Sequence, residues 1–148
     1  MTTGRICTRE VYLADPDETV EAIAHRMHER GVGSLLVLDD ARRPVGIVTD
    51  RDLVLRVLAA DRDPLTTRVA DVMTRDPRTV GEETPIEQTL SLMRAYGVRR
   101  VPVVDPGGTL VGVVTLDDVL TLLTEELTIV GEVLSKQNPP RLLDDLLV

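Results

Sequence analysis

Apolar residues recur with helical spacing in two stretches of the chain, and both stretches are predicted to be helices. Within residues 20–27 and 86–93, apolar side chains stand three or four positions apart. Acidic residues stand at the start of each stretch, where they would interact favourably with the positive end of a helix dipole. Gly31 and Gly97 follow, at the position where a helix commonly ends in glycine.

Continuous apolar runs follow each helix and predict a pair of strands, with a further helix after the pair. A short strand is also predicted before each first helix. The predicted strands and second helices are, in chain order, 11–14, 34–38, 45–49 and 50–59, then 79–80, 101–104, 110–115 and 116–126. Each half therefore reads β-α-β-β-α, which predicts a mixed α/β fold of the α+β kind.

The two halves are copies of each other. Cys7–Val54 aligns without a gap on Met73–Leu120, 66 positions further on, and 13 of the 48 pairs are identical. Such an internal repeat indicates two units of the same structure. The predicted boundaries are 1–60 for the first unit, 61–70 for a connecting segment, 71–126 for the second unit and 127–148 for a C-terminal helical tail.

Composition narrows the possible partners. The net charge of −8 argues against nucleic acid, because binding to a phosphate backbone needs a basic face. A single cysteine excludes an internal disulfide and fits a reducing compartment. No apolar run reaches the roughly 20 residues that a membrane-spanning helix needs. The first residues, MTTGRIC, lack the pattern of a signal peptide, so we expect a cytoplasmic protein without membrane insertion.

Each half carries the motif G-x-x-T-x-x-D where its last strand meets its second helix. The glycines, Gly46 and Gly112, are expected to let a ligand approach the backbone. The threonines stand where backbone N–H groups and a helix dipole attract phosphate. The aspartates are expected to accept hydrogen bonds from ribose hydroxyls, as acidic residues do in dinucleotide folds. The remaining motif residues are Thr49, Asp52, Thr115 and Asp118.

The same motif has a simpler interpretation. Threonine as N-cap with an acidic residue three positions later is a capping box, which stabilises a helix start without any ligand. For one isolated copy this interpretation is the better one, and the duplication is what favours a binding site. Both interpretations can hold for the same residues.

Arginines near the motifs are the candidates for binding phosphate, and aliphatic side chains are the candidates for holding a base. Arg51 stands in the first motif, TDRD, whereas the second reads TLDD, so we expect the first cleft to hold an anion better. The sequence leaves open which cleft receives Arg99 and Arg100. With so few aromatic residues, the base is expected to lie against aliphatic side chains, namely Val11, Val80, Val101 and Pro102.

The chain resembles the CBS-domain family. The resemblance rests on the doubled unit, on GIVTDRDL and GVVTLDDV, on ADVMTRDPRTV and on GVRRVPVVD. It implies two units packed around a pseudo-two-fold axis, with two clefts for a regulatory ligand: AMP, ADP, ATP or S-adenosylmethionine. It also implies a homodimer that regulates another, unidentified protein rather than catalysing a reaction.

No residues suggest catalysis or a required cofactor. His25 and His28 have a spacing that could share a metal, but no third ligand stands nearby, so no metal is expected. Cys7 lacks a histidine partner and is interpreted as an incidental thiol. The leading hypothesis is a regulatory module that senses adenine nucleotides. Its rivals are a ligand-free dimerisation or interaction scaffold and, less favoured, an enzyme acting on a nucleotide.

Overall fold

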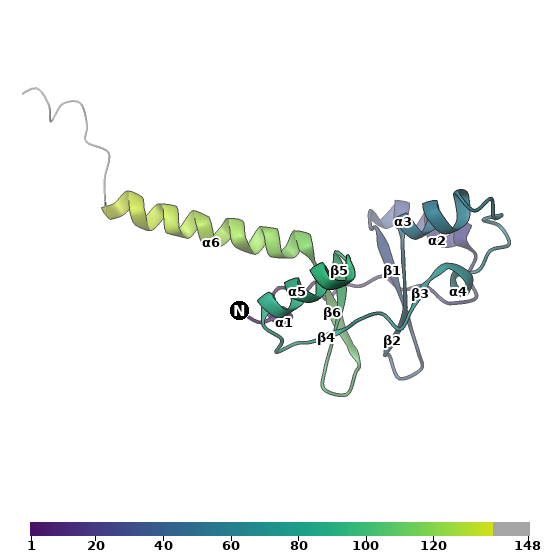
Figure 1. Cartoon of the computed structure of the whole chain (residues 1–148), viewed down its shortest axis with the longest axis horizontal. Helices are drawn as coiled ribbons and strands as arrows, with labels where there is room; N and C mark the ends of the chain where they lie inside the picture. The colour runs from purple at the N-terminus through teal and green to yellow at the C-terminus, as the bar shows by residue number, and fades with distance from the viewer. Residues whose placement is uncertain (138–148) are drawn as a thin grey trace, which may run out of the picture.

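The computed structural model describes residues 1–137, which form two similar units side by side and one long helix that projects from the second unit (Figure 1). The first unit contains α2 (Val20–Arg30), β1 (Ser34–Leu38), β2 (Pro44–Thr49), α3 (Asp50–Leu53) and the π-helical turn η1 (Val54–Leu58). The second contains β4 (Val80–Gly81), α5 (Ile86–Tyr96), β5 (Arg100–Val104), β6 (Leu110–Thr115) and α6 (Leu116–Gln137). The predicted α+β fold is confirmed.

The periodic helices and the hairpin strands lie where the apolar pattern predicts them. Thr19 caps α2 by accepting a hydrogen bond from the Ala22 N–H. Gly31 and Gly97 both adopt a φ of 63°, the left-handed conformation that closes α2 and α5. The predicted strand at 11–14 is reduced to one parallel bridge, between Leu13 and Leu36. The helix predicted at 50–59 is α3 followed by η1.

Three short elements that the pattern did not predict connect the units: α1 (Thr3–Ile6), α4 (Val69–Val72) and β3 (Thr74–Arg75). β3 follows the first unit in the chain and pairs antiparallel with that unit's β2. Thr8, its counterpart at the start of the first repeat, pairs through its backbone with Val113 of β6 in the second repeat. The start of each repeat therefore adds to the sheet of the other repeat. We call residues 1–8 and 69–75 the crossing segments.

The motif glycines are explained by these crossing segments. A Cβ on Gly46 would overlap the Met73 Sδ, and one on Gly112 would lie 2.6 Å from the Thr8 carbonyl oxygen. The expectation that a ligand approaches the backbone at Gly46 and Gly112 is therefore wrong: the chain itself fills that space. Glycine is needed so that a neighbouring strand can pack closely.

The second helix of the second repeat continues well beyond its predicted end at residue 126. α6 runs to Gln137, and its side chains are exposed from Leu123 onward. Residues 127–137 of the predicted tail are thus helical, and residues 138–148 lie outside the described part. No helix within residues 1–137 combines the length and the apolar character needed to cross a membrane.

Candidate functional site

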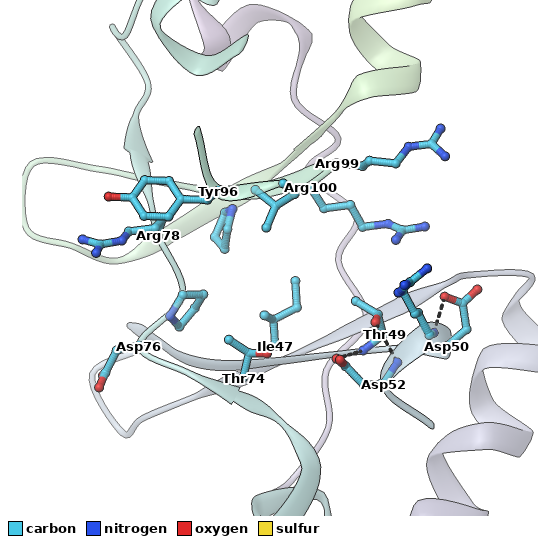
Figure 2. Close-up of a pocket in the computed structure, with 15 residues that line it drawn as sticks. Ile47, Thr49, Asp50, Asp52, Thr74, Asp76, Arg78, Tyr96, Arg99 and Arg100 are labelled. Carbon is cyan, nitrogen blue, oxygen red and sulfur yellow. Dashed lines mark hydrogen bonds between the residues drawn. The ribbon is translucent and has the colours of Figure 1, made fainter. Parts of the chain in front are cut away.

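The larger of two clefts lies between the two units. Cleft 1 has a volume of about 760 Å³ and contains the first motif at one wall and residues of the second repeat at the other (Figure 2). Its lining residues are Ile47, Thr49, Asp50, Arg51, Asp52, Thr74, Asp76, Pro77, Arg78, Tyr96, Gly97, Val98, Arg99, Arg100 and Pro102. Its volume lies within the range of small-molecule binding sites, about 300–1,000 Å³.

Cleft 2 is the pseudo-symmetric counterpart and is much smaller, about 190 Å³. Its lining residues are Thr8, Glu10, Val11, Tyr12, Val32, Gly33, Ser34, Leu36, Arg100, Val113 and Thr115. All of them except Arg100 stand 66 positions before or after a lining residue of cleft 1. The two clefts are therefore lined by equivalent positions of the two repeats.

Both motifs form complete capping boxes. The Thr49 Oγ1 accepts from the Asp52 N–H at 3.2 Å, and the Asp52 Oδ2 accepts from the Thr49 N–H at 2.9 Å. The second motif repeats both bonds, at 3.2 Å to the Thr115 Oγ1 and 2.7 Å to the Asp118 Oδ2. The capping interpretation is confirmed, and the ribose and phosphate roles of these four residues remain a prediction.

The two boxes differ in what their remaining groups contact. The Thr115 hydroxyl also donates to the Asp118 Oδ2 at 2.8 Å, whereas the structure gives the Thr49 hydroxyl no acceptor among residues 1–137. The Asp52 Oδ1 lies 3.6 Å from the guanidinium of Arg56, whose counterpart in the second repeat is Leu122. Thr49 therefore keeps a donor available to a ligand in cleft 1.

Four arginines line cleft 1. Arg51, Arg99 and Arg100, all predicted as phosphate ligands, lie in this one cleft together with Arg78. Of the two arginines whose cleft the sequence left open, Arg99 lines cleft 1 alone and Arg100 lines both clefts. Three carboxylates accompany them: Asp50, Asp52 and Asp76.

Two of these arginines already have neighbours. The Arg99 guanidinium lies 3.4 Å from an oxygen of Asp117, but both side chains are more than two-thirds exposed, so the pair is weak. Arg100 extends to the boundary of the two clefts and lines both. Its Nη2 lies 2.7 Å from the place where a Cβ on Gly33 would stand.

The four residues predicted to form an adenine pocket do not lie together in one cleft. Pro102 lines cleft 1 and Val11 lines cleft 2, so these two residues cannot hold the same base. Val101 and Val80 lie in the hydrophobic core of the second unit, 0% and 8% exposed, and line neither cleft. Side chains alternate between the two faces of a strand, so Val101 points into the core when Pro102 points into the cleft.

Nine cleft 1 residues were not among the predicted site residues, and Asp76, Pro77, Arg78 and Tyr96 are four of them. The 66-residue offset contained the signal, because Val11 aligns on Pro77 rather than on Val80. Arg78 lies 4.6 Å above the Tyr96 ring, a cation–π contact. The first repeat has the same contact with the partners exchanged.

In that repeat, Arg30 lies 5.6 Å above the ring of Tyr12. The exchange places a cation on the wall of cleft 1 and a tyrosine on the wall of cleft 2. The Tyr12 hydroxyl donates to Glu10 at 3.1 Å. Glu10 aligns on Asp76, so both clefts have an acidic residue at this position.

Two further groups from the sequence analysis are Cys7 and a possible metal site. Burial raises the pKa of the Cys7 thiol, the opposite of what activates a nucleophile. Within residues 1–137, no three His, Cys, Asp or Glu side chains are grouped so that they could hold a metal ion.

Comparison with known proteins agrees with this repeat architecture. A family model of the CBS domain matches the chain twice, over residues 4–59 and 69–125. The chain belongs to the CBS-domain family. It is 36% identical over 120 residues to the uncharacterised protein MK0525 of Methanopyrus kandleri, covering 81% of this chain and 61% of that protein.

The match to an enzyme is partial. The chain is 39% identical over 111 residues to an inosine-5'-monophosphate dehydrogenase of Korarchaeum cryptofilum. That match covers 75% of this chain and 22% of the enzyme. Sequence similarity at this coverage shows a shared CBS part and does not assign the activity of that enzyme to this chain.

Solved structures of CBS-domain proteins superpose over most of the chain. A putative signal-transduction protein of Burkholderia ambifaria gives a TM-score of 0.77 at 30% identity, covering 83% of this chain and 93% of that one. CBSX2 in complex with AMP gives 0.73 at 27% identity, with 84% and 97% covered. The CBS pair of MJ0100 with 5-methylthioadenosine and S-adenosyl-L-methionine gives 0.74 at 25%, with 83% and 99% covered.

Proposed function

We propose that this CBS pair is a regulatory module that binds an adenine nucleotide in cleft 1 and signals its occupancy to a partner protein. The observation that carries the proposal is the composition of cleft 1. One space of about 760 Å³ combines the Thr49–Asp52 junction with four arginines. CBSX2, a structural neighbour, binds AMP, and the MJ0100 pair binds adenosyl compounds, which supports an adenosine-containing ligand.

The charge of the cleft favours phosphate over a cationic adenosyl ligand. Guanidinium groups bind phosphate through paired, charge-assisted hydrogen bonds. S-adenosylmethionine has no phosphate for the arginines to bind, and its positive sulfonium group is not favoured where four arginines stand against three aspartates. AMP, ADP and ATP are therefore better ligands for cleft 1 than S-adenosylmethionine.

Each part of the nucleotide has a counterpart in the cleft. Phosphate would meet Arg51, Arg99 and Arg100, together with the free Thr49 hydroxyl. The ribose would lie against Asp52. One carboxylate oxygen of Asp52 would then give up its present contact, with the Thr49 N–H or with Arg56, and accept from a ribose hydroxyl. The base would lie against the apolar lining residues Ile47, Val98 and Pro102.

Isothermal titration of the full chain with ATP, AMP, adenosine and S-adenosylmethionine tests this proposal. We expect the nucleotides to bind at least about tenfold more tightly than adenosine, the equivalent of one charge-assisted hydrogen bond. At about 100 times the Kd, ligand should add about 2.7 kcal/mol to the free energy of unfolding. Absence of any binding at millimolar nucleotide would overturn it.

A matched pair of variants locates the site. Asp52→Asn should weaken nucleotide binding, and Asp118→Asn should leave it unchanged, although both retain much of the capping ability. Equal effects of the two variants would exclude cleft 1 as the principal site.

Signalling requires that the nucleotide binds one arrangement of the two units more tightly than another. Cleft 1 is formed from both units, and the crossing segments connect their sheets. Hydrogen exchange of residues 1–8 and 69–75 should therefore slow when ATP is bound. Unchanged exchange in an ATP-saturated sample would leave the nucleotide without a structural signal and refute the regulatory part.

The second candidate function is a ligand-free interaction scaffold. It is favoured by the two capping boxes, which are complete without a ligand. In that case no nucleotide changes the unfolding transition, and Asp52→Asn and Asp118→Asn differ only in stability.

A further inference from the structure

The outer part of α6 presents an apolar stripe that nothing in residues 1–137 covers. Six side chains on it are between 49% and 71% exposed: Leu120, Leu123, Leu127, Val130, Val133 and Leu134. Apolar side chains exposed together to this extent mark an interaction surface. The helix projects from the second unit into solvent (Figure 1).

The stripe has the spacing of a coiled coil. Leu120, Leu123, Leu127, Val130 and Leu134 are separated by three, four, three and four residues, the a and d positions of a heptad repeat. Gln137 occupies the next d position. The spacing is that of a helix packed along its length against another helix, rather than of one lying on a globular surface.

Outside the stripe, α6 is mostly polar, and its hydroxyl groups are internally satisfied. The hydroxyls of Thr121, Thr124, Thr128 and Ser135 each donate to the carbonyl oxygen four residues earlier, at 2.9–3.0 Å. Glu125, Glu132 and Lys136 also lie away from the stripe. Ile129, 56% exposed, is an apolar residue on this side, so the apolar residues of α6 are concentrated on the stripe but not confined to it.

The flanks of the stripe indicate what packs on it. Coiled coils choose unlike partners through charges at the e and g positions. Between residues 119 and 137 those positions hold Val119, Thr124, Gly131 and Val133, with Glu126 as the only charged residue. In a parallel pair of identical helices Glu126 would face Gly131, so two copies meet without like-charge contact.

A lipid surface fits the helix less well. Helices that lie on membranes carry Lys and Arg on the polar side, because membrane surfaces are anionic. The polar side and flanks of α6 carry three glutamates and one lysine. The charge would therefore oppose membrane binding.

We propose that the apolar stripe of α6 is a homodimer seam, in which the α6 helices of two copies of this chain pack against each other. The six exposed side chains of two helices bring on the order of 1,000 Å² to the contact, the size at which specific interfaces begin. The seam is independent of both clefts, and each dimer would carry two copies of cleft 1.

Sedimentation equilibrium of the full chain tests the seam with a matched pair of variants. Leu127→Glu places a charge in the centre of the stripe, and Thr128→Glu places the same charge one residue away, outside it. We expect Leu127→Glu to raise the dissociation constant at least about 100-fold and Thr128→Glu to keep the native assembly. A native chain that is monomeric at 100 µM overturns the proposal, as does a Leu127→Glu variant with the native mass.

A distance measurement distinguishes the seam from dimers formed elsewhere. In a Cys7→Ser background, a spin label on Ser135→Cys reports the separation of two α6 helices. A helix of 22 residues is about 33 Å long, so helices paired side by side keep the labels within about 35 Å in either direction. That distance should vanish on adding Leu127→Glu and persist with Thr128→Glu; a dimer without it refutes the seam.

Discussion

Cleft 1 and cleft 2 are built from the same elements under one 66-residue offset, yet their volumes are about 760 and 190 Å³. Their charges differ as much as their volumes. The four arginines of cleft 1, Arg51, Arg78, Arg99 and Arg100, align on Asp117, Tyr12, Gly33 and Ser34. No position that is basic in cleft 1 is basic in its counterpart.

The comparison teaches that the fold supplies the cleft and a few substitutions supply its chemistry. The capping box is present in both repeats and therefore does not distinguish the two clefts. The arginines do, because Arg51, Arg78 and Arg99 line cleft 1 alone. Under the proposed function, the duplicated fold keeps cleft 2 for structure and uses cleft 1 for the nucleotide.

The largest expected effect comes from removing this difference. Arg51→Gln together with Arg100→Gln should weaken ATP binding about 100-fold, because two charge-assisted hydrogen bonds of about 1.5 kcal/mol each are lost. Isothermal titration measures the change. Arg5→Gln with Arg94→Gln is the matched control, since both of these arginines are exposed and outside the clefts. Equal affinities in the two double variants would contradict the assignment of phosphate to cleft 1.

The next largest effect is expected from replacing the motif glycines of β2 and β6 by alanine. Gly112→Ala places a Cβ against the Thr8 backbone carbonyl, and Gly46→Ala places one against the flexible Met73 side chain. Overpacking costs about 1–3 kcal/mol, and we expect Gly112→Ala near the upper end and Gly46→Ala near the lower. Urea unfolding measures both. A larger loss for Gly46→Ala would contradict the contact of Gly112 with the first crossing segment.

Local patterns were sufficient to predict most elements. Helix period, caps and hairpin sequences act within a few residues, so the strands β1, β2, β5 and β6 lie within one residue of their predicted bounds. The helices α2 and α5 cover the predicted periodic stretches and end at the predicted glycines. The crossing segments were missed because β3 has two residues, and its partner β2 stands 27 positions earlier. A strand that short has no period to detect.

The candidate site could be predicted only in part, for those residues that the 66-residue offset between the repeats relates to each other. The motif residues and Arg51 follow from the repeat itself. Grouping Arg99 and Arg100 with Thr49 required knowing that each cleft combines one unit's motif with the other unit's strand. Val80 and Val101 were misplaced because an apolar run does not indicate which side chains point into the core.

Replacing either motif threonine should lower the stability of the protein by a similar amount, but only one replacement should weaken nucleotide binding. Thr49→Val and Thr115→Val each remove a helix N-cap, which costs about 1 kcal/mol. Thr115→Val should cost somewhat more, because its hydroxyl also donates to Asp118. Only Thr49→Val should weaken ATP binding, measured by titration. Thr121→Val, whose hydroxyl bonds only within α6, is the control; a loss of affinity in Thr115→Val would assign the nucleotide to cleft 2.

The smallest expected effect concerns an ion pair that only the first repeat has. Arg26 donates to Glu18 and, at 2.8 Å, to the Leu13 carbonyl oxygen, so it holds the segment that forms a wall of cleft 2. In the second repeat the corresponding residues are Leu92 and Thr84. The segment that forms the wall of cleft 1 lacks this clamp.

The Glu18–Arg26 pair should make the first repeat sensitive to acid. Hydrogen bonding from Arg26 lowers the pKa of Glu18 in the folded state. The stabilisation is therefore complete above the unfolded-state pKa, about 4.3, and is lost as pH falls through the lower folded-state value. Glu18→Gln should cost at most about 1 kcal/mol at pH 7 and approach no cost near pH 3, measured by urea unfolding. A cost that does not change with pH, or one matched by the exposed Glu83→Gln, would show that the clamp is not electrostatic.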